Sequence, residues 1–314
     1  MKLKKPFLLA VVPAIAALLL IGCEDDSSNL TIVNREQGKT ELNTNKNNNP
    51  LYPDAVRLEF PQLQADGTLL LIHKTNDKEG INYSVEWNVG MKAQNWTAYR
   101  IHRGQGTGAG YDGIWEEDPD LPQYARAVNS NSCYSGSGFD RGHICPSADR
   151  QYSKIANHQT FYYSNMQPQY HTFNAGPRVN GDQKYTSPWV RLESSIRTWG
   201  RDVMGDTLYV VKGGTIRDDQ IFSYKLNNEI PIPSYFFVAL LKKCKTEYYA
   251  IGFWIRHDDV DHGSTPLRDY AVNIDRLEAL TGFDFFCNLP DGTENRIESM
   301  TVSETLGYLS DWNL

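Results

Sequence analysis

One eight-residue segment limits what this chain can be more than any other stretch: residues 139–146, which read FDRGHICP. It places a carboxylate (Asp140), a guanidinium (Arg141), a glycine and an imidazole (His143) in consecutive positions ahead of a proline. A single histidine is more often a structural residue than a catalyst, and neighbouring Asp and Arg residues more often form a surface ion pair. A given tetrapeptide occurs by chance in roughly one chain in five hundred of this length, so this one is a motif that needs supporting context.

The first 23 residues have the organisation of a bacterial export signal. Three lysines within the first five residues precede an apolar run over residues 6–21, which is short for a membrane-spanning helix. The run ends in LIGC, which resembles the lipobox whose cysteine, here Cys23, is lipidated and becomes the mature N-terminus. We therefore expect a signal peptide over residues 1–22 and a lipid anchor on Cys23. An uncleaved membrane anchor is the alternative.

The residue after Cys23 is glutamate rather than aspartate, which in the usual bacterial sorting pattern predicts the outer membrane, with the periplasmic and cell-surface faces both open. Residues 23–50 are polar and rich in asparagine, and they hold too little apolar surface to fold alone. We interpret them as a disordered tether. From residue 51 to residue 314 the composition is globular.

The globular part mixes strands with a few helices and has no regular alternation, which predicts a single α+β domain over residues 51–314. Its strands are expected at residues 81–89, 96–103, 207–212, 234–242 and 247–254, the last two as a hairpin. Ser187-Pro188 and Asn273 are typical helix starts, so helices are expected from residue 188 to about Gly200 and from residue 274 to about Gly282.

The charge of the chain gives two opposing indications. The net charge is -7, and it falls to -10 when three lysines leave with the signal, which argues against a nucleic-acid partner. Residues 140–201, however, hold eight Lys and Arg residues against four Asp and Glu residues. A locally basic cleft on an acidic protein therefore stays open.

Lipidation of Cys23 would leave four cysteines: Cys133, Cys145, Cys244 and Cys287. An even number in an oxidising compartment makes disulfides plausible, and we expect Cys133 to pair with Cys145, where the bond would brace residues 139–146, and Cys244 to pair with Cys287. Buried free thiols are the alternative. No cysteine or histidine spacing indicates structural zinc.

The supporting context lies downstream of the first motif. SNMQPQ begins at Ser164, Asn174 follows, and WVRLE ends at Glu193. In this order the motifs resemble the DNA/RNA non-specific endonuclease family, which includes mitochondrial endonuclease G. The resemblance covers roughly residues 96–289, and LEALTGFDFF from Leu277 extends it. It implies a ββα-metal nuclease fold, with a central, mainly antiparallel sheet and flanking helices.

The resemblance also implies a role for each motif residue. His143 would be the general base, Asn174 the side-chain ligand of Mg²⁺, for which Mn²⁺ can substitute, and Glu193 would orient water on the metal. Arg141 and Arg197 would bind the scissile phosphate. The substrates would be DNA and RNA, and the sequence leaves open both the preference between them and the formation of a homodimer.

This chemistry is reasonable without the family. Phosphodiester hydrolysis needs an activated nucleophile and a stabilised leaving oxygen, which a histidine and a hard divalent cation can supply. Mg²⁺ keeps most of its waters, so one asparagine oxygen can be enough protein ligand, and the arginine fork suits phosphate. Each residue alone has a plainer reading: Asn174 as a turn residue, Asn165 as structural support, and Glu193 with Arg197 as a helical ion pair of about 0.3–0.5 kcal/mol.

Two departures from the family pattern affect these assignments. About eleven extra residues lie between Asn174 and Trp189, which leaves Asn180 as a rival metal ligand. Where the family often has a substrate-binding arginine, before the segment IWEEDP, this chain has Asp112-Gly113, so that contact is missing or is supplied by Arg103. Besides an endonuclease, the sequence therefore allows a catalytically weak nucleic-acid-binding surface lipoprotein of the same fold. A purely structural lipoprotein would leave His143 unexplained.

Overall fold

The computed structural model describes residues 42–110, 113–127, 130–202, 206–312 and 314. The predicted signal peptide, the lipidation site Cys23 and the first part of the predicted tether lie outside these residues. Among the described helices, none combines the length and the apolar character needed to cross a membrane.

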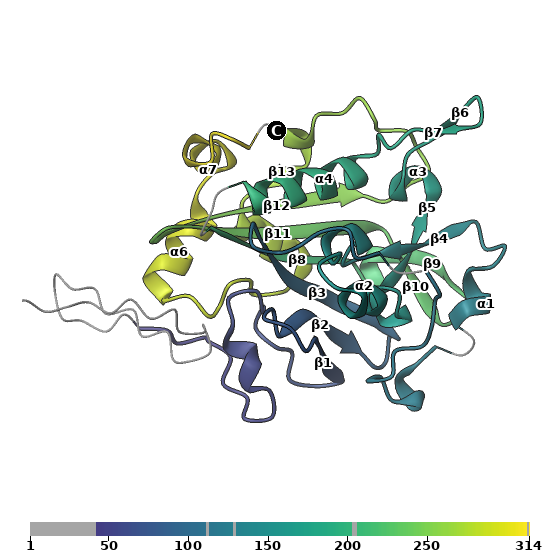
Figure 1. Ribbon diagram of the computed structural model, residues 1–314, viewed down its shortest axis with the longest axis horizontal. Coiled ribbons are helices and arrows are strands. Elements are labelled where there is room, and N and C mark those ends of the chain that lie inside the picture. The colour runs from purple at the N-terminus through teal and green to yellow at the C-terminus, as the bar shows by residue number, and fades with distance from the viewer. Residues whose placement is uncertain (1–41, 111–112, 128–129, 203–205, 313) are drawn as a thin grey trace, which may run out of the picture. The chain divides into compact units, whose positions relative to one another are not determined.

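The fold is α+β and is built on one seven-stranded antiparallel sheet, as predicted (Figure 1). Its strands, in spatial order, are β1 (Thr68–Lys74), β2 (Ile81–Asn88), β3 (Ala93–His102), β8 (Thr207–Gly214), β11 (Tyr235–Cys244), β12 (Glu247–Arg256) and β13 (Ala271–Val272). The predicted hairpin is β11 and β12, whose register starts at Cys244 opposite Glu247. The other three predicted strands are β2, β3 and β8.

Apolar side chains alternate along the strands, so the sheet has a core on each face. On one face, α4 (Pro188–Arg201) packs through Trp189, Leu192, Ile196 and Trp199. On the other face, α5 (Ile274–Thr281) and α6 (Asp291–Ser299) pack through Ile274, Leu277 and Ile297.

Both predicted helix starts are confirmed. Ser187 Oγ accepts a hydrogen bond from Val190 N at 3.2 Å, and Asn273 Oδ1 accepts one from Arg276 N at 3.1 Å. Each cap satisfies a backbone N–H that has no partner within its own helix. The α5 helix ends at Gly282 with φ +79°, a left-handed conformation that favours glycine.

A smaller layer stands beside the sheet, near the N-terminal end of α4 (Figure 1). Here β4 (Phe139–His143) pairs antiparallel with β5 (Met166–Tyr170), and His143 lies opposite Met166. The short helix α3 (His171–Asn174) follows β5, and the hairpin of β6 (Arg178–Val179) and β7 (Asp182–Gln183) connects it to α4. These elements place the residues of the first motif against those of α4.

The remaining elements are short: η1 (Pro53–Val56), η2 (Gln123–Ala125), α1 (Ser130–Tyr134), η3 (Ser147–Asp149), α2 (Lys154–Gln159), η4 (Tyr163–Asn165), η5 (Asp218–Gln220), β9 (Ile221–Leu226), β10 (Ile230–Pro233), η6 (Leu267–Tyr270) and α7 (Val302–Tyr308).

Residues 42–50, which were assigned to the tether, are bound to the C-terminal part of the fold. Asn43 Nδ2 donates to the Leu289 carbonyl at 2.6 Å, and Thr44 N donates to Asp291 at 2.8 Å. Asn47 is buried and donates to the carbonyls of Ala55 and Pro61. The asparagine-rich composition serves hydrogen bonding at this end of the segment.

The predicted disulfides are wrong, because none of the four described cysteines is disulfide-bonded. Cys145 is buried in the core between the sheet and α4, while Cys133 belongs to a separate cluster beside β10. Cys244 packs against the core on the α4 face of the sheet. Cys287 is buried on the other side, where its Sγ lies 3.8 Å from the carbonyl oxygen of Phe60, a residue of the second core. The sequence showed an even number of cysteines, but it did not show that the sheet separates two of them.

Candidate active site

His143 ends β4 with its ring packed against two aromatic side chains that also contact each other. The ring centroids of Trp115 and Phe161 each lie 5.1 Å from the centroid of the imidazole. Burial and the positive charge of Lys212 lower the pKa of His143 to about 4. Its Nε2 atom is buried and has no hydrogen-bond partner among the described residues. At neutral pH this side chain is therefore an uncharged imidazole with an unprotonated ring nitrogen.

The glycine of the motif has a steric reason. A Cβ atom on Gly142 would lie 2.2 Å from Cδ of Gln169, a buried residue of the neighbouring strand β5. Any side chain at this position would therefore displace Gln169 or separate the two strands. Glycine keeps β4 and β5 paired at the position just before His143.

Asn165 holds the chain on the other side of His143. Its Oδ1 accepts from Cys145 N at 2.8 Å, and its Nδ2 donates to the carbonyls of Cys145 and Thr160, each at 2.9 Å. Asn165 is fully buried, and both ends of its amide are used. This is the structural support that the sequence suggested for it.

The Asp140 carboxylate orients Asn174. Asn174 Nδ2 donates to Asp140 Oδ2 at 3.0 Å, and Nδ1 of His171 lies 2.8 Å from the same oxygen. Because the amide nitrogen faces Asp140, the amide oxygen of Asn174 points away from it. This oxygen is a ligand type that suits a hard divalent cation.

Glu193 and Arg197 lie one turn apart on α4 and bind different partners. Glu193 Oε1 accepts from Lys212 Nζ at 2.6 Å, and Arg197 Nε donates to the buried Asp149 at 2.7 Å. The hydroxyl of Tyr99 donates to the other oxygen of Asp149. The plainer reading, in which Glu193 and Arg197 pair with each other, is therefore not what the structure shows.

Burial raises the pKa of Glu193, and the charge of Lys212 acts in the opposite direction. Lys212 itself is fully buried in β8, and its Nζ lies 4.3 Å from the centre of the Trp189 ring. The Lys212 ammonium is thus bound by two residues of α4, the Glu193 carboxylate and the face of the Trp189 ring. It sits close enough to His143 to lower the pKa of that imidazole.

We expect Lys212→Met to destabilise the protein by about 3–5 kcal/mol, because it removes one partner of a buried ion pair and leaves Glu193 buried without its cation. Urea denaturation of the purified protein measures this. Lys154→Met, at an exposed position of α2, is the matched control and should change the free energy of unfolding by less than about 0.5 kcal/mol. A loss below about 1 kcal/mol for Lys212→Met would show that the pair is not stabilising.

The other sequence-predicted residues lie at varying distances from this group. The Arg141 guanidinium lies 5.5 Å from the Trp115 ring centre and 5.6 Å from that of Tyr134, so Trp115 contacts both Arg141 and His143. Arg103 is exposed, and its Nη1 donates to the Asp202 carbonyl at the C-terminal end of α4. Its partner Asp202 is therefore about two and a half helical turns from Glu193.

Two further positions bear on the departures from the family pattern. Asn180 is exposed at the tip of the β6–β7 hairpin, whereas Asn174 lies beside Asp140. Gly113 has φ +75°, and a Cβ there would lie 3.5 Å from the Phe161 ring. An arginine at position 113 would have a strained backbone because of this positive φ. Gly113→Arg is therefore a poor way to restore the substrate-binding arginine that the family often has here.

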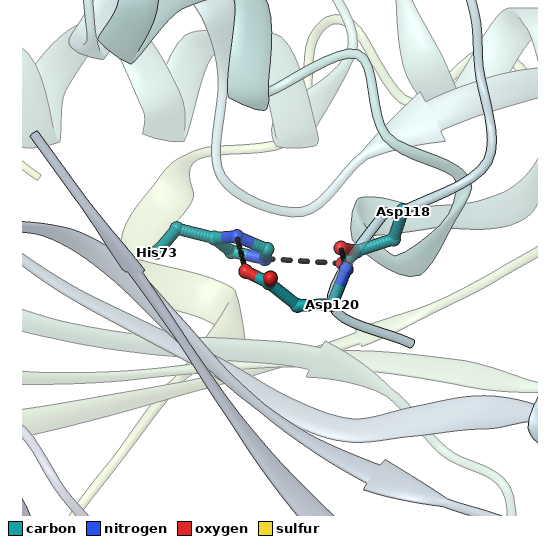
Figure 2. Close-up of side chains that lie close together, drawn as sticks. All are labelled: His73, Asp118 and Asp120. Atoms are coloured by element: carbon teal, nitrogen blue, oxygen red, sulfur yellow. Dashed lines mark hydrogen bonds and ion pairs between the residues drawn. The ribbon is translucent and has the colours of Figure 1, made fainter. Parts of the chain in front are cut away.

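Three groups of carboxylate and imidazole side chains among the described residues come close enough to hold a cation, and none contains His143 or Asn174. The first is His73 with Asp118 and Asp120 (Figure 2). His73 Nε2 lies 3.2 Å from Asp118, and Nδ1 lies 3.6 Å from Asp120. Burial opposes protonation of His73, but these carboxylates prevail and raise its pKa to about 9. Without a metal it is therefore an imidazolium in an ion cluster at neutral pH, and a cation would have to displace its proton to bind there.

Asp118 also connects this cluster to the second motif, because the hydroxyl of Ser164 donates to its carboxylate. The two other groups share Glu298: one adds Asp275 and Glu278, the other Asp284 and Glu294. Burial raises the pKa of Glu298 to about 9 and of Glu278 to about 8. At neutral pH these carboxyls hold protons, which a cation would have to displace.

Sequence reasoning missed Lys212, Asp149 and His171 as members of the site. A signal existed for Lys212, since it directly follows the apolar run of residues 208–211 within the same predicted strand, where a lysine is unusual unless its charge is paired. Asp149 and His171 gave no such signal, because each lies among polar residues in the sequence.

Comparisons with known proteins identify relatives of this chain. The family model for DNA/RNA non-specific endonuclease matches residues 72–292. The chain is 28% identical over 221 residues to Nuclease C1 of Cunninghamella echinulata var. echinulata, with 68% of this chain and 83% of that protein covered. It is 30% identical over 224 residues to a nuclease of Nostoc sp., with 69% and 75% covered.

Human mitochondrial endonuclease G is 28% identical over 198 residues, with 60% of this chain and 62% of that protein covered. A crystal structure of EndoG in complex with EndoGI superimposes with a TM-score of 0.55 at 18% identity. It covers 71% of this chain and 89% of the EndoG structure's matched chain, which shows a shared fold.

Proposed function

Because this chain belongs to the DNA/RNA non-specific endonuclease family and is thus a metal-dependent endonuclease, we propose that His143 is its general base and Mg²⁺ its metal. The observation that carries the proposal is the unpaired, buried Nε2 of a neutral His143. A buried polar atom without a hydrogen-bond partner destabilises the folded protein. A general base needs such an unpaired nitrogen to bind the attacking water, which is one reason for the protein to retain it. His143 would take the proton from that water as it attacks phosphorus.

Asn174 fits the role of metal ligand. Asp140 fixes its amide nitrogen, so its oxygen is available to a hard cation that keeps most of its own waters. A bound Mg²⁺ would supply charge stabilisation for the phosphate and its leaving oxygen, and Mn²⁺, which accepts the same oxygen ligands, can substitute. The exposed Asn180 has no comparable orienting contact among the described residues.

The charged residues of α4 face the substrate side in this proposal. Glu193 and Arg197 line a common cavity of about 620 Å³. Asp149 holds Arg197 through Nε, which leaves the other two guanidinium nitrogens for the phosphate, and the planar fork suits phosphate oxygens. Glu193, held by Lys212, would position the attacking water. Arg141 would bind the phosphate from the β4 side. Arg103, near the C-terminal end of α4, would contact the nucleic-acid strand farther from the cleaved bond.

The test is cleavage of plasmid DNA and of a long RNA by the purified protein, with Mg²⁺ or with a chelator. We expect both polymers to be cut internally, and only with the metal. Binding of both without cleavage would instead support a catalytically weak nucleic-acid-binding lipoprotein of the same fold. Cleavage that persists in chelator would contradict the role of the metal.

The protonation of His143 gives a pH prediction. Its pKa of about 4 lies below the ordinary value of 6.5, so the native state binds fewer protons than the unfolded state between these two values. The contribution of His143 to the free energy of unfolding is therefore fully present above pH 6.5, and it is lost as the pH falls from 6.5 towards 4. By NMR, the His143 ring should not titrate between pH 8 and pH 5. His171 should titrate above 6.5, because Gln183 and Asp140 raise its pKa. A His143 midpoint near 6.5 would contradict the prediction.

We also propose that the chain is a lipoprotein anchored through Cys23 in the outer membrane. The LIGC sequence and the following Glu24 support this assignment. Cys23→Ala should move most of the protein out of the outer-membrane fraction, as followed by membrane fractionation and immunoblotting, with Cys133→Ala as the control. A Cys23→Ala protein that stays in the membrane fraction would argue against lipidation.

A further inference from the structure

The insertion between Asn174 and Trp189 forms an ordered hairpin. Arg178 pairs with Gln183 and Val179 with Asp182. The two residues of the turn, Asn180 and Gly181, have φ of +54° and +86°, the backbone form that matches the twist of a tight hairpin. The extra residues are therefore a built element next to the proposed metal ligand.

Side-chain contacts fix the base of this hairpin to the active site. Gln183 Oε1 lies 2.7 Å from His171 Nε2, and the other nitrogen of His171 contacts the Asp140 oxygen that holds Asn174. Gln183 Nε2 donates to the Gly176 carbonyl at 2.8 Å. A Cβ on Gly176 would lie 2.1 Å from the Lys184 carbonyl, so the two arms of the hairpin meet closely here.

A second clamp holds the segment after the hairpin. Arg191 on α4 donates from Nε to the Thr186 carbonyl at 3.0 Å and from Nη2 to the Thr265 carbonyl at 2.6 Å. The backbone beside Tyr185 is thus tied to α4 and to the loop before η6. The position of Tyr185 follows from these contacts.

The side chains that the hairpin exposes suit nucleic acid. Arg178 is exposed, and the Lys184 side chain is 46% exposed, with the Asp182 carboxylate 3.7 Å from its Nζ. Tyr185 is 69% exposed, so its ring contributes little to the core of the protein. It lines the same 620 Å³ cavity as Glu193 and Arg197, and this volume is in the range of small-ligand pockets.

We propose that residues 176–186 form a substrate-binding arm in which Tyr185 stacks on an unpaired base next to the cleaved phosphate, while Arg178 and Lys184 neutralise neighbouring phosphates. The arm rests on the proposed nuclease function and adds a substrate class, single-stranded nucleic acid. Base stacking on an aromatic ring is favourable for any sequence, but it requires a base that is not already stacked in a duplex. Each cation contributes through the release of counterions from the phosphate chain.

The test measures binding by fluorescence anisotropy in metal-free buffer, where cleavage does not interfere. The probes are a labelled single-stranded DNA oligonucleotide and the same strand in a duplex. We expect the wild-type protein to bind the single strand more tightly, and Tyr185→Ala to weaken that binding about ten-fold or more while Tyr185→Phe retains it. Tyr308→Ala removes an exposed tyrosine of α7 outside the cavity and should bind as the wild type does.

Lys184→Ala and Arg178→Ala should each reduce the slope of log affinity against log salt by about one unit. Equal binding of the single strand and the duplex by the wild type, or an equal loss for both with Tyr185→Ala, would overturn the single-strand assignment. Unchanged binding by Tyr185→Ala would overturn the arm itself. Cleavage of plasmid by the wild-type protein is scored separately, so failure of the arm is distinguishable from failure of the nuclease function.

Discussion

Replacing His143 with alanine should lower kcat for plasmid cleavage by about 10²–10⁴-fold, the usual contribution of a general base. The physical reason is that the other histidines near this site already have partners. Burial lowers the pKa of His257 to about 4, so it is neutral too, but its Nε2 accepts from Tyr170 N and its Nδ1 donates to the Pro233 carbonyl. His171 is held between Asp140 and Gln183, which raise its pKa, and His73 is an imidazolium in a separate ion cluster. Initial rates under saturating Mg²⁺ measure the effect.

The fold should survive this substitution, because His143 has no hydrogen bond on its Nε2 to lose. Circular dichroism and binding of an oligonucleotide without metal would check that. His262→Ala is the matched control, since that histidine pairs with Asp258 in a different loop and should leave kcat unchanged. Activity of His143→Ala within a few fold of the wild type would remove His143 from the mechanism.

Asn174→Ala should reduce metal-dependent cleavage by about 100-fold or more. Groups that only orient a metal ligand typically contribute 10–100-fold, and Asn174 is proposed as the ligand itself. A Mg²⁺ titration of the cleavage rate would show a higher metal concentration at half-maximal activity as well as a lower plateau. Binding of the metal-free protein to nucleic acid should change little, because the amide does not carry charge.

Asn180→Ala provides the comparison within the same insertion. Its exposed position at the hairpin tip predicts a rate within about two-fold of the wild type. The reverse result, with Asn180→Ala inactive and Asn174→Ala active, would mean that the motif alignment across the insertion is shifted and that the hairpin carries the metal ligand.

Local sequence signals predicted the strands and helix starts whose formation depends on residues close to them in the chain. Alternation at residues 81–89 gave β2, and cap residues at Ser187 and Asn273 gave the starts of α4 and α5. In these cases a backbone donor or an apolar face has its partner within a few residues or in a repeating pattern. The motif order also predicts that His143 and Asn174 belong to one site, and this assignment stays a prediction.

The rest depended on contacts distant in sequence. Lys212 pairs with Glu193 only because β8 lies beneath α4, and no local pattern gives that neighbour. The cysteine pairing failed because the sheet separates Cys244, which packs against the core on the α4 face, from Cys287, which lies beside Phe60 of the other core. The polar residues 42–47 looked like tether because their hydrogen-bond partners lie about 240 residues away in the chain.

The most direct measurement of the central proposal is chemical rescue of the His143→Ala protein. The substitution removes the imidazole that packs beside Trp115 and Phe161, where added imidazole could bind. If His143 acts as the general base, added imidazole should raise the cleavage rate of His143→Ala with saturation, and should not raise that of Asn174→Ala. A folded His143→Ala protein that binds substrate and Mg²⁺ but whose rate does not respond to imidazole would contradict the role proposed for His143.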